Sequence, residues 1–479
     1  MCMEAKKIHY NQNLHPTIEF SHLYKALLTV QTTFSHAAQE VLQSCEWTLS
    51  RDNISGSFAL SFYPECEMGG QKKSVFDNIK ILDIVKIYEP SENNVPVFIG
   101  VVKTKKITGS ANAEGGFRRV SVQGYAITGL VNDYTINLDT TALSITKQLA
   151  TNEDLQKELT EQFSNSFDNP VKTVIKAVWE YFQKTTEKGK GLITSDVGLM
   201  IKSLLGDKTA FFDVDDSTIH YPLANMFHGQ TTQNFFDIID GLIPEPYYEK
   251  FAYTDENGKM KIKIRKVPFS PSDWKKQRQK SLFSLDVDNG KNTNNLVKSF
   301  ALEQSDREVY TVFIPYLEGY PVSEDKMLKI AAMESNTSEV DGRIKLGEKF
   351  AIYGYRPLLV HFIGYTKPDG KDDGSTKSAM QDVANNLKEM YEHLPDMVGG
   401  NITMSFYHRG KSAPIMCGDI VRFMGLQFYV DGVTHSWQYG QNGEINLSVS
   451  RGGVYELDGS FNAEKTAKAQ IGSMASLLK

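Results

Sequence analysis

One strand pattern occurs twice in this chain, once near each end, and such a repeat restricts the fold more than any other feature of the sequence. The first copy reads SFALSFYPE, LDIVKIY, VFIGVV and RVSVQGY between residues 57 and 125. The second reads NITMSFYHR, GDIVRFM, FYVDGVTHSWQ and EINLSVSRG between residues 401 and 452. Because apolar and polar residues alternate in both copies, each predicts a set of half-buried antiparallel strands. We therefore expect residues 57–125 and 401–451 to share a fold.

Two stretches carry the correspondence between the copies. Ser61-Phe62-Tyr63 corresponds to Ser405-Phe406-Tyr407, and Asp83-Ile84-Val85-Lys86 corresponds to Asp419-Ile420-Val421-Arg422. In the second pair an Asp precedes an apolar pair and a cation, which gives a strand one buried and one wet face. A single match of this length also arises by chance in β-proteins, so the argument depends on four matches in the same order.

The pattern between the two copies is different. From about residue 140 the apolar residues follow a helical period, and Thr376 to Leu394 predicts a helix that Pro395 ends. Alternation around Asn257-Gly258 predicts a hairpin within residues 245–269. We predict a mixed, β-rich α+β protein in which two barrels or sandwiches enclose helical and α/β segments. The expected regions are an N-terminal β unit (1–140), a middle helical and α+β region (141–295), a second β unit (296–455) and a helical tail (456–479).

Composition excludes several classes of protein. The 479 residues are 41% hydrophobic and 23% charged, with a formal net charge of -6, so disorder and a duplex-DNA binder are not expected. No apolar run approaches the roughly 18 residues of a membrane span, and the N-terminus lacks the apolar core of a secretory signal. The four cysteines form no CxxC pair, which indicates reduced thiols. We expect synthesis in the cytoplasm and no stable membrane insertion.

A search for catalytic chemistry finds weak signals. The chain has no HExxH, GxSxG or phosphate-binding P-loop motif. Asp213, Asp215, Asp216 and His220 could bind a metal, although a solvated acidic turn explains them as well. Asp369, Asp372 and Asp373 lack the Glu that closes a calcium loop, so we expect a hairpin tip there.

Three further groups have both a functional and a structural interpretation. Glu245 and Glu249 lie four apart and could form a paired-carboxylate site, but one such pair is more often structural. His435 beside Trp437 has no nucleophile nearby and is expected to be a packed aromatic. The basic stretch Trp274 to Lys280 is expected to be a solvated loop, with contact to an acidic partner as the alternative. We expect no catalytic, cofactor-binding or metal residues, and the chain is not expected to be an enzyme.

Three stretches together resemble one family, the baseplate hub proteins of phage tails and contractile injection systems, which include late control protein D and the Mu-like hub proteins. The first is the N-terminal copy of the strand pattern, with Asp83. The second is the segment that holds Glu245, Tyr247 and Glu249 and ends in R-x-x-P-F at Arg265, Pro268 and Phe269. The third, and most specific, is the C-terminal pattern Y-V-x-x-V-x-H-x-W…R-G, which follows Asp419 and holds Tyr429, Val430, Val433, His435, Trp437, Arg451 and Gly452.

The resemblance implies two tube-like antiparallel β-barrels related by internal duplication. It also implies a structural hub that forms a homotrimeric, pseudo-six-fold ring, adapts a hexameric tail tube to a trimeric spike and lines the central channel. The implied partners are the tail tube protein, the spike protein, the tape-measure protein and other baseplate proteins, with DNA or cargo only in passage. Three chains at -6 would give a lumen that repels phosphates. The implied location is the tail baseplate of a virion or an injection particle.

Two other functions are compatible with the sequence. A tail-associated peptidoglycan hydrolase would need the metal or nucleophile motif that the search did not find. A different tail-tip structural protein, such as a distal tail protein or a fibre adaptor, would share tube-like barrels, but it is not expected to have the duplicated barrel together with the EPYYE-type middle segment.

Overall fold

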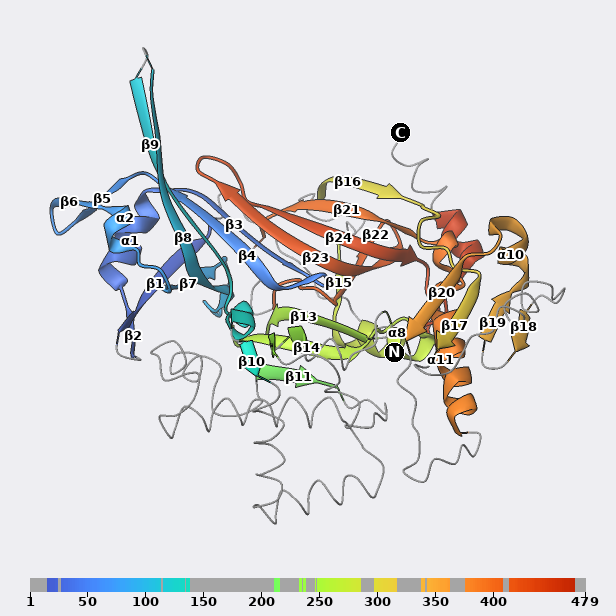
Figure 1. Ribbon diagram of the computed structural model, residues 1–479. Helices are drawn as coiled ribbons and strands as arrows, with labels where there is room; N and C mark the ends of the chain where they lie inside the picture. The colour runs from blue at the N-terminus through green and yellow to red at the C-terminus, as the bar shows by residue number, and fades with distance from the viewer. Residues whose placement is uncertain are drawn as a thin grey trace.

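The computed structural model describes residues 15–24, 27–112, 115–133, 135–137, 211–215, 232–234, 236–237, 246, 248–285, 297–316, 337–340, 343–361, 375–407 and 413–469 (Figure 1). The segment 142–205, the residues Asp216, His220, Glu245 and Tyr247, and the acidic stretch 369–373 lie outside these ranges.

The N-terminal half is a run of antiparallel strands. Its main members lie side by side in the order β3-β4-β9-β8-β7-β1-β2. The bounds are β1 (Thr17–Tyr24), β2 (Leu27–Val30), β3 (Leu42–Ser50), β4 (Asn53–Phe62), β7 (Ile84–Tyr88), β8 (Pro96–Asn112) and β9 (Gly115–Ala126). Helices α1 (Thr32–Glu40), α2 (Val75–Asn78) and η1 (Ile127–Asp133) and the small hairpin of β5 (Glu65–Met68) and β6 (Gln71–Ser74) complete this half.

The C-terminal half repeats this arrangement. Its strands follow the order β16-β21-β24-β23-β22-β15. The bounds are β15 (Leu282–Ser284), β16 (Val297–Glu303), β21 (Val398–Ser405), β22 (Ile420–Phe423), β23 (Leu426–Gln438) and β24 (Glu444–Gly453). Because β15 pairs with β22, the strands of this half begin before residue 296.

The expected likeness of the two strand orders is confirmed by the pairing. Strands β3, β4, β9, β8 and β7 correspond in order to β16, β21, β24, β23 and β22, and all neighbours within each set are antiparallel. Two bulges also recur at matching places. One lies between Leu42 and Ser44 and again between Val297 and Ser299. The other follows Val102 in β8 and Val430 in β23. One end strand differs, because β1 is antiparallel to β7 whereas β15 is parallel to β22.

The turn before β7 is built like the turn before β22. Leu82 and Gly418 both have positive φ, at 72° and 85°. Each donates its N–H over 2.8 Å, to the carbonyl of Val102 in one half and of Val430 in the other. The following Asp accepts the N–H three residues upstream, as Asp83 does from Lys80 at 2.7 Å and Asp419 from Met416 at 2.8 Å. The correspondence of Asp83 with Asp419 therefore holds in the structure.

The other expected correspondence was wrong by two residues. Ser61 pairs with Ser121, and in the second half the matching pair is Thr403 with Asn446. Ser61 thus corresponds to Thr403, and not to Ser405. A shift of two residues keeps every side chain on the same face of a strand, so the alternation of the sequence cannot detect it.

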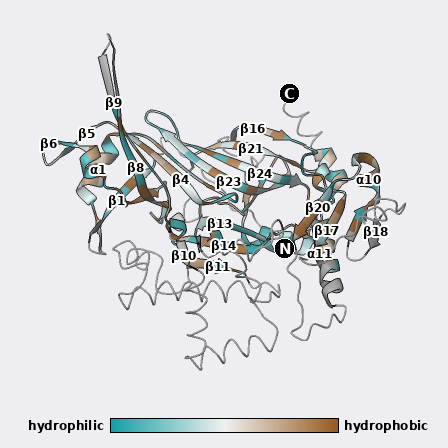
Figure 2. Ribbon diagram, viewed as in Figure 1, coloured by the Kyte–Doolittle hydropathy of each residue, from teal (hydrophilic) through white to brown (hydrophobic). Residues whose placement is uncertain are grey.

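A direct strand pairing joins the two halves. The outer part of β23 pairs antiparallel with β3, from Gly432 opposite Ser50 to Gln438 opposite Ser44. The result is one 13-stranded sheet, whose long strands cross the upper part of Figure 1. Its apolar face packs into the main core, and Figure 2 shows the alternation along the strands. Burying each large side chain of this face contributes about 1.5–3 kcal/mol. The face includes Trp47, Phe58, Leu60, Val122, Ile402, Val433 and Leu447.

The middle region packs against this core. The predicted hairpin is present as β13 (Tyr248–Thr254) and β14 (Met260–Lys266), with Gly258 at φ +72°, and β11 (Phe212–Val214) runs parallel to β14. The remaining strands are β10 (Thr135–Asn137) with β12 (Thr232–Asn234), and the sheet of β17 (Val312–Tyr316), β18 (Thr337–Val340), β19 (Arg343–Leu346) and β20 (Pro357–His361). That sheet contacts α10 (Gly347–Tyr353) and α11 (Ser375–Tyr391), and η4 (Leu394–Asp396) follows α11.

One local expectation was wrong. The basic stretch at Trp274 is not a loop, because Ser270 accepts the N–H of Asp273 and caps the helix α8 (Pro271–Lys280), with Pro271 in its first turn. Two further stretches differ from what their composition favours. The Gly/Asn stretch 109–116, which has loop-like composition, is largely strand, since β8 runs to Asn112 and β9 starts at Gly115. The helical pattern that starts at about Thr232 begins instead with the strand Thr232–Asn234, and the described residues Phe236 and Asp237 after it are helical. The protein is a β-rich α+β protein, and no described helix has the length and apolar character that a bilayer crossing requires.

Candidate functional site: a polar sheet face and the buried junction behind it

The face of the sheet opposite the core is made mainly of short polar side chains. Because neighbouring strands are in register, polar residues stand mostly opposite polar residues across both halves and across the β3–β23 junction, with Ala59 and Ala301 as apolar neighbours on the same face. The set is partly or fully exposed except for Ser61. Glu46 is its charged member, and four further charged residues lie on the same face: Lys106, Arg119, Glu303 and Glu444. We call the set the polar face: Ser44, Glu46, Thr48, Ser61, Ser121, Gln123, Asn401, Thr403, Thr434, Ser436, Asn446 and Ser448.

The two halves meet at His435. Its Nδ1 lies 2.6 Å from Oε1 of Glu89, and the indole N–H of Trp47 donates to the same oxygen over 3.3 Å. The rings of Trp47 and His435 stack with centroids 4.0 Å apart. All three residues are buried, and they come from β3, the end of β7 and β23. His435 therefore serves to bind one half to the other, as the expectation of a packed aromatic implied. Trp437, which the sequence motif places two residues after His435, stands opposite Cys45 in the same pairing of β23 with β3.

A second buried group ties the hairpin of the middle region to both halves. Arg265 on β14 donates to Oε1 of Glu249 at 2.7 Å and to the hydroxyl of Tyr429 at 2.8 Å. It also donates to Gln277 at 2.7 Å and to the carbonyl of Gly418 at 3.1 Å. Most of the donors of its guanidinium are thus satisfied in a site without water access. Tyr429 in turn donates to Glu249 Oε1 over 2.6 Å.

Arg51 completes this charge network from the turn between β3 and β4. Its Nε lies 2.8 Å from Glu249 Oε2, and its Nη1 lies 2.7 Å from Asp431 Oδ1. Phe269 lies beneath two guanidinium groups, since the Cζ atoms of Arg51 and Arg451 are 5.5 and 3.6 Å from its ring centroid. The charge network therefore comprises Arg51, Glu249, Arg265, Tyr429 and Asp431, with Phe269 and Arg451 packed against it.

Burial and the neighbouring charges act together on the pKa values of this network. Burial alone would lower the pKa of Arg265, but Tyr429 and Glu249 hold it above its ordinary value. Burial likewise opposes the charge on Arg51, yet Glu249 and its other neighbours raise the pKa. Burial raises the pKa of the Tyr429 hydroxyl, and the negative charge of Glu249 adds to the effect. The group is thus a fixed set of ionic hydrogen bonds and not a proton-transfer site.

The motif residues predicted from sequence fall into three sets. The structure brings Glu249, Arg265, Phe269 and Arg451 together, and buried Pro268 continues the chain between two of them. Asp83 and Asp419 lie apart, at matching turns of the two halves. Glu245 and Tyr247 are outside the described residues. Sequence reasoning missed Arg51, Glu89, Gln277 and Asp431. Arg51 and Glu89 lie just beyond strand ends, Asp431 stands at a variable position of the C-terminal pattern, and Gln277 lies in the stretch that was expected to be a solvated loop.

The expected solvated acidic turn near residue 213 was wrong where the chain is described, because Asp213 lies on strand β11 and pairs with Lys263 of β14. Asp213 accepts from the hydroxyl of Tyr253 at 2.6 Å and lies 3.0 Å from Nζ of Lys263. Burial works against its charge, but these two partners lower the pKa of the Asp213 carboxyl. Within the described residues no three His, Cys, Asp or Glu side chains gather in a geometry that could hold a metal. The described cysteines, Cys45, Cys66 and Cys417, are buried and free.

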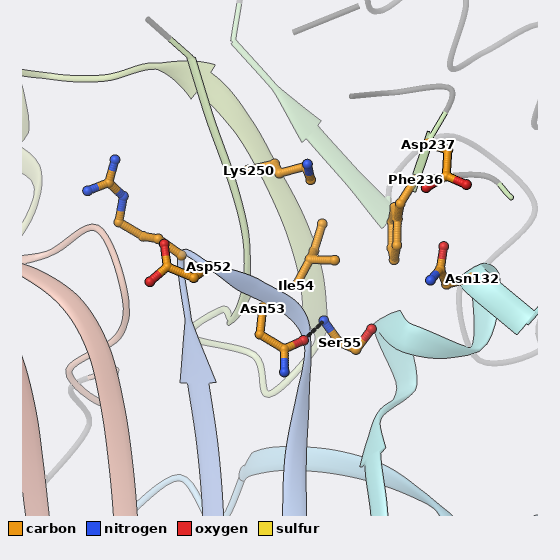
Figure 3. Close-up of a pocket in the computed structure, with 9 residues that line it drawn as sticks. Asp52, Asn53, Ile54, Ser55, Asn132, Phe236, Asp237 and Lys250 are labelled. Atoms are coloured by element: carbon orange, nitrogen blue, oxygen red, sulfur yellow. Dashed lines mark hydrogen bonds between the residues drawn. The ribbon is translucent and has the colours of Figure 1, made fainter. Parts of the chain in front are cut away.

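A pocket of about 420 Å³ opens beside the turn between β3 and β4 (Figure 3). The side chains drawn there are mainly charged or amide groups, among them Asp52, Asn53, Asn132, Asp237 and Lys250. Asn53 is engaged in the turn, because its side-chain oxygen accepts the N–H of Ser55 at 3.0 Å. The lining offers polar contacts but no Ser–His, Cys–His or metal-binding arrangement, so it suggests no reaction.

Comparison with known proteins gives structural likenesses at low sequence identity. No protein-family model matches the chain, and no curated protein matches its sequence. The tail protein from Neisseria meningitidis MC58 is similar with a TM-score of 0.46 and 8% identity, over 91% of this chain and 96% of that chain. The 43 kDa tail protein of prophage MuSo2 from Shewanella oneidensis is similar with a TM-score of 0.43 and 12% identity, over 91% and 98%. The E. coli c3393 protein, described as a component of the type VI secretion system, is similar with a TM-score of 0.37 and 9% identity, over 88% and 76%.

Proposed function

We propose that this chain is the structural baseplate hub of a phage tail or phage-like injection device, and that three copies form a ring around a central channel. The observation that carries the proposal is the pair of matched halves joined edge to edge, with one polar face running across both. Three such chains present six like units, which suits a six-fold tail tube at one end and leaves three-fold symmetry for a spike at the other.

The polar face is proposed to line the channel. Hydroxyl and amide side chains keep a passage wet without binding its contents tightly, and the charged residues on this face carry both signs, Glu46, Glu303 and Glu444 against Lys106 and Arg119. The overall charge of -6 therefore matters less to the lumen than the sequence suggested. Passage of DNA or protein cargo is compatible with such a lining, because tight binding of phosphates needs clustered Lys and Arg.

The partners follow from this position. The tail tube protein would bind at the pseudo-six-fold end, and the spike protein at the three-fold end. The tape-measure protein and other baseplate proteins would contact the ring during assembly. The location is the tail baseplate of the virion or injection particle.

Electron microscopy of the purified chain, alone and co-expressed with its tube protein, tests the proposal. We expect rings of three times 53.8 kDa, about 161 kDa, that look nearly six-fold from one end and three-fold from the other. Rings of six chains, or hub chains at the periphery of the particle and away from the tube axis, would overturn it.

The proposal assigns no catalytic role to the chain. The buried ionisable groups are held in ionic hydrogen bonds, as described for the charge network. In a zymogram on purified cell walls we expect no clearing by the isolated chain. Clearing that is lost on substitution of a single residue would establish the alternative, a tail-associated peptidoglycan hydrolase.

A further inference from the structure

The equivalent strands β23 and β8 differ in how much of their edges is paired. In the C-terminal half, β23 pairs with β24 along one edge, and the outer part of its other edge pairs with β3 of the N-terminal half. The equivalent strand β8 pairs with β9 in the same way. From Thr104 onward, the other edge of β8 has no strand beside it in the described part of the chain. Among the described residues, the N-terminal half therefore has an unpaired strand edge at the place where the C-terminal half makes its junction.

In the described part of the chain, the strand edge that matches β3 is also unpaired. Strand β16 corresponds to β3, and both carry a one-residue bulge at the same place. One edge of β16 pairs with β21, and within the described residues the other has no neighbour. In Figure 1, β16 and the β8–β9 hairpin lie in different parts of the molecule, so one chain cannot join them. Unpaired edges of this kind are a risk of uncontrolled association unless a partner covers them.

We propose that β8 of one copy pairs antiparallel with β16 of a second copy and repeats between chains the junction that β23 and β3 make within one chain. This inference rests on the proposed ring and specifies how it closes. Each copy supplies one β8 edge and one β16 edge, so the contact is head to tail. Such contacts close into a ring when the rotation per copy fits.

The internal junction fixes the register. Val102 corresponds to Val430, because both accept the matching N–H at the turn before β7 and β22. Counting past the shared bulge, Lys106 corresponds to Thr434 and Ile107 to His435. Strands β4 and β21 give the second comparison. Ser61 corresponds to Thr403, so their partners Ser44 of β3 and Ser299 of β16 also correspond. Counting along these strands, Leu302 corresponds to Trp47 and Glu303 to Thr48.

At the internal junction, Thr434 stands opposite Thr48 and His435 opposite Trp47. When the same pairs are transferred to the contact between chains, Lys106 stands opposite Glu303 and Ile107 opposite Leu302.

The chemistry of these residues suits that register. Within the chain, the hydroxyls of Thr48 and Thr434 lie 3.1 Å apart. At the equivalent place between chains, exposed Lys106 and Glu303 have opposite charges, and opposite charges directly across a ladder are favourable. Ile107 is 49% exposed in the single chain, and Leu302 would cover it. A slip of one residue would place Lys106 opposite Leu302 and lose both pairs.

Disulfide trapping between two different variants tests the pairing between chains. One variant carries Lys106→Cys and the other Glu303→Cys, both in a Cys2→Ser background; the three described native cysteines are buried. Because each variant has one introduced thiol, a heterodimer of two times 53.8 kDa, about 108 kDa, reports a contact between copies. The control replaces Glu303→Cys with Ala301→Cys, one side-chain repeat along the same face. Directly opposite Cβ atoms come within about 5 Å and diagonal ones do not, so the control should react at least about ten-fold more slowly.

Charge reversal gives a second measurement. Lys106→Glu or Glu303→Lys alone should weaken association by about three- to ten-fold, and the double reversal in one chain should restore it. Lys72→Glu, an exposed reversal on β6, should have no effect.

The outcomes separate this inference from the proposed function. A 161 kDa ring that forms without the Lys106–Glu303 disulfide would overturn the edge pairing and leave the hub proposal standing; the mass is three times 53.8 kDa. The disulfide in an assembly of another copy number would support the pairing and overturn the three-fold ring. A chain that stays monomeric at about 100 µM, where an edge interface with even a micromolar Kd is occupied, and gives no disulfide would overturn the pairing.

Discussion

Glu249 is buried and binds two arginines, Arg265, which is buried, and Arg51, which is partly buried. We expect Glu249→Gln to lower the free energy of unfolding by about 3–5 kcal/mol, because it leaves buried Arg265 without a carboxylate partner and Arg51 with Asp431 alone. Chemical denaturation followed by tryptophan fluorescence measures the change. The control is Glu65→Gln, whose exposed partner Lys72 lies 3.9 Å away, and it should cost less than about 1 kcal/mol. A loss below that value for Glu249→Gln would show that the network contributes little.

The carboxyl of Asp213 should make stability depend on acid pH. Burial opposes its charge, yet Tyr253 and Lys263 bring its folded-state pKa below the ordinary value of 3.8. A depressed pKa stabilises the folded state fully above 3.8, and the benefit is lost as the pH falls through the folded-state pKa. Asp213→Asn should therefore lower the urea midpoint at pH 7 and converge with the wild type towards pH 3. An equal deficit at both pH values would contradict this assignment.

The turns before β7 and β22 contain the same positive-φ backbone conformation, which is adopted by a leucine in one turn and by a glycine in the other. Leu82 and Gly418 both have positive φ, but their surroundings differ. A Cβ at Gly418 would lie 2.5 Å from Cζ of Phe251 and 2.6 Å from Nη2 of Arg265. Gly418 is thus required by the hairpin packed over it, and not only by its φ.

Substitution at these two turns should consequently have different effects. Gly418→Ala should cost about 2–4 kcal/mol, since it adds a clash in a packed site to a strained φ. Leu82→Gly removes strain and some packing, so a change of about 1 kcal/mol or less is expected. Thermal unfolding of the two variants checks the contrast. Comparable losses would show that φ alone decides the residue at these positions.

The regular elements were predicted where the local sequence dominates. The β4 and β7 strands, the hairpin around Gly258 and the helix before Pro395 follow from alternation, turn residues and a helical stripe. Helix α8 was missed because its stability comes from the Ser270 cap and from buried Trp274, and a count of basic residues reveals neither. Residues Thr232–Asn234 look helical in sequence but pair with β10, which lies almost a hundred residues earlier in the chain.

A channel lined mainly by hydroxyl and amide groups should bind DNA when positive charge is added to it. Gln123 and Ser448 occupy matching, exposed positions of the polar face. We expect the double variant Gln123→Lys/Ser448→Lys to bind DNA in filter assays with an affinity that falls steeply with salt, because each lysine at the lining can displace counterions. The wild type should bind weakly.

The matched control adds two lysines away from the polar face, at Asn257 and Gln441, which are exposed in turns. It carries the same net charge as the test variant. Equal DNA binding by the two variants would mean that the polar face is not the surface DNA meets.

The sequence by itself determined that there are two like β halves, that one face of each is buried, and which residues start the matching turns at Asp83 and Asp419. These properties are local, because alternation and turn chemistry act over a few residues. The tertiary structure alone decided the two-residue offset of Ser61, the joining of β23 to β3, and the meeting of Arg51, Glu249 and Arg265. A strand pattern of period two fits several registers and either edge, so contacts between segments far apart in the chain select among them.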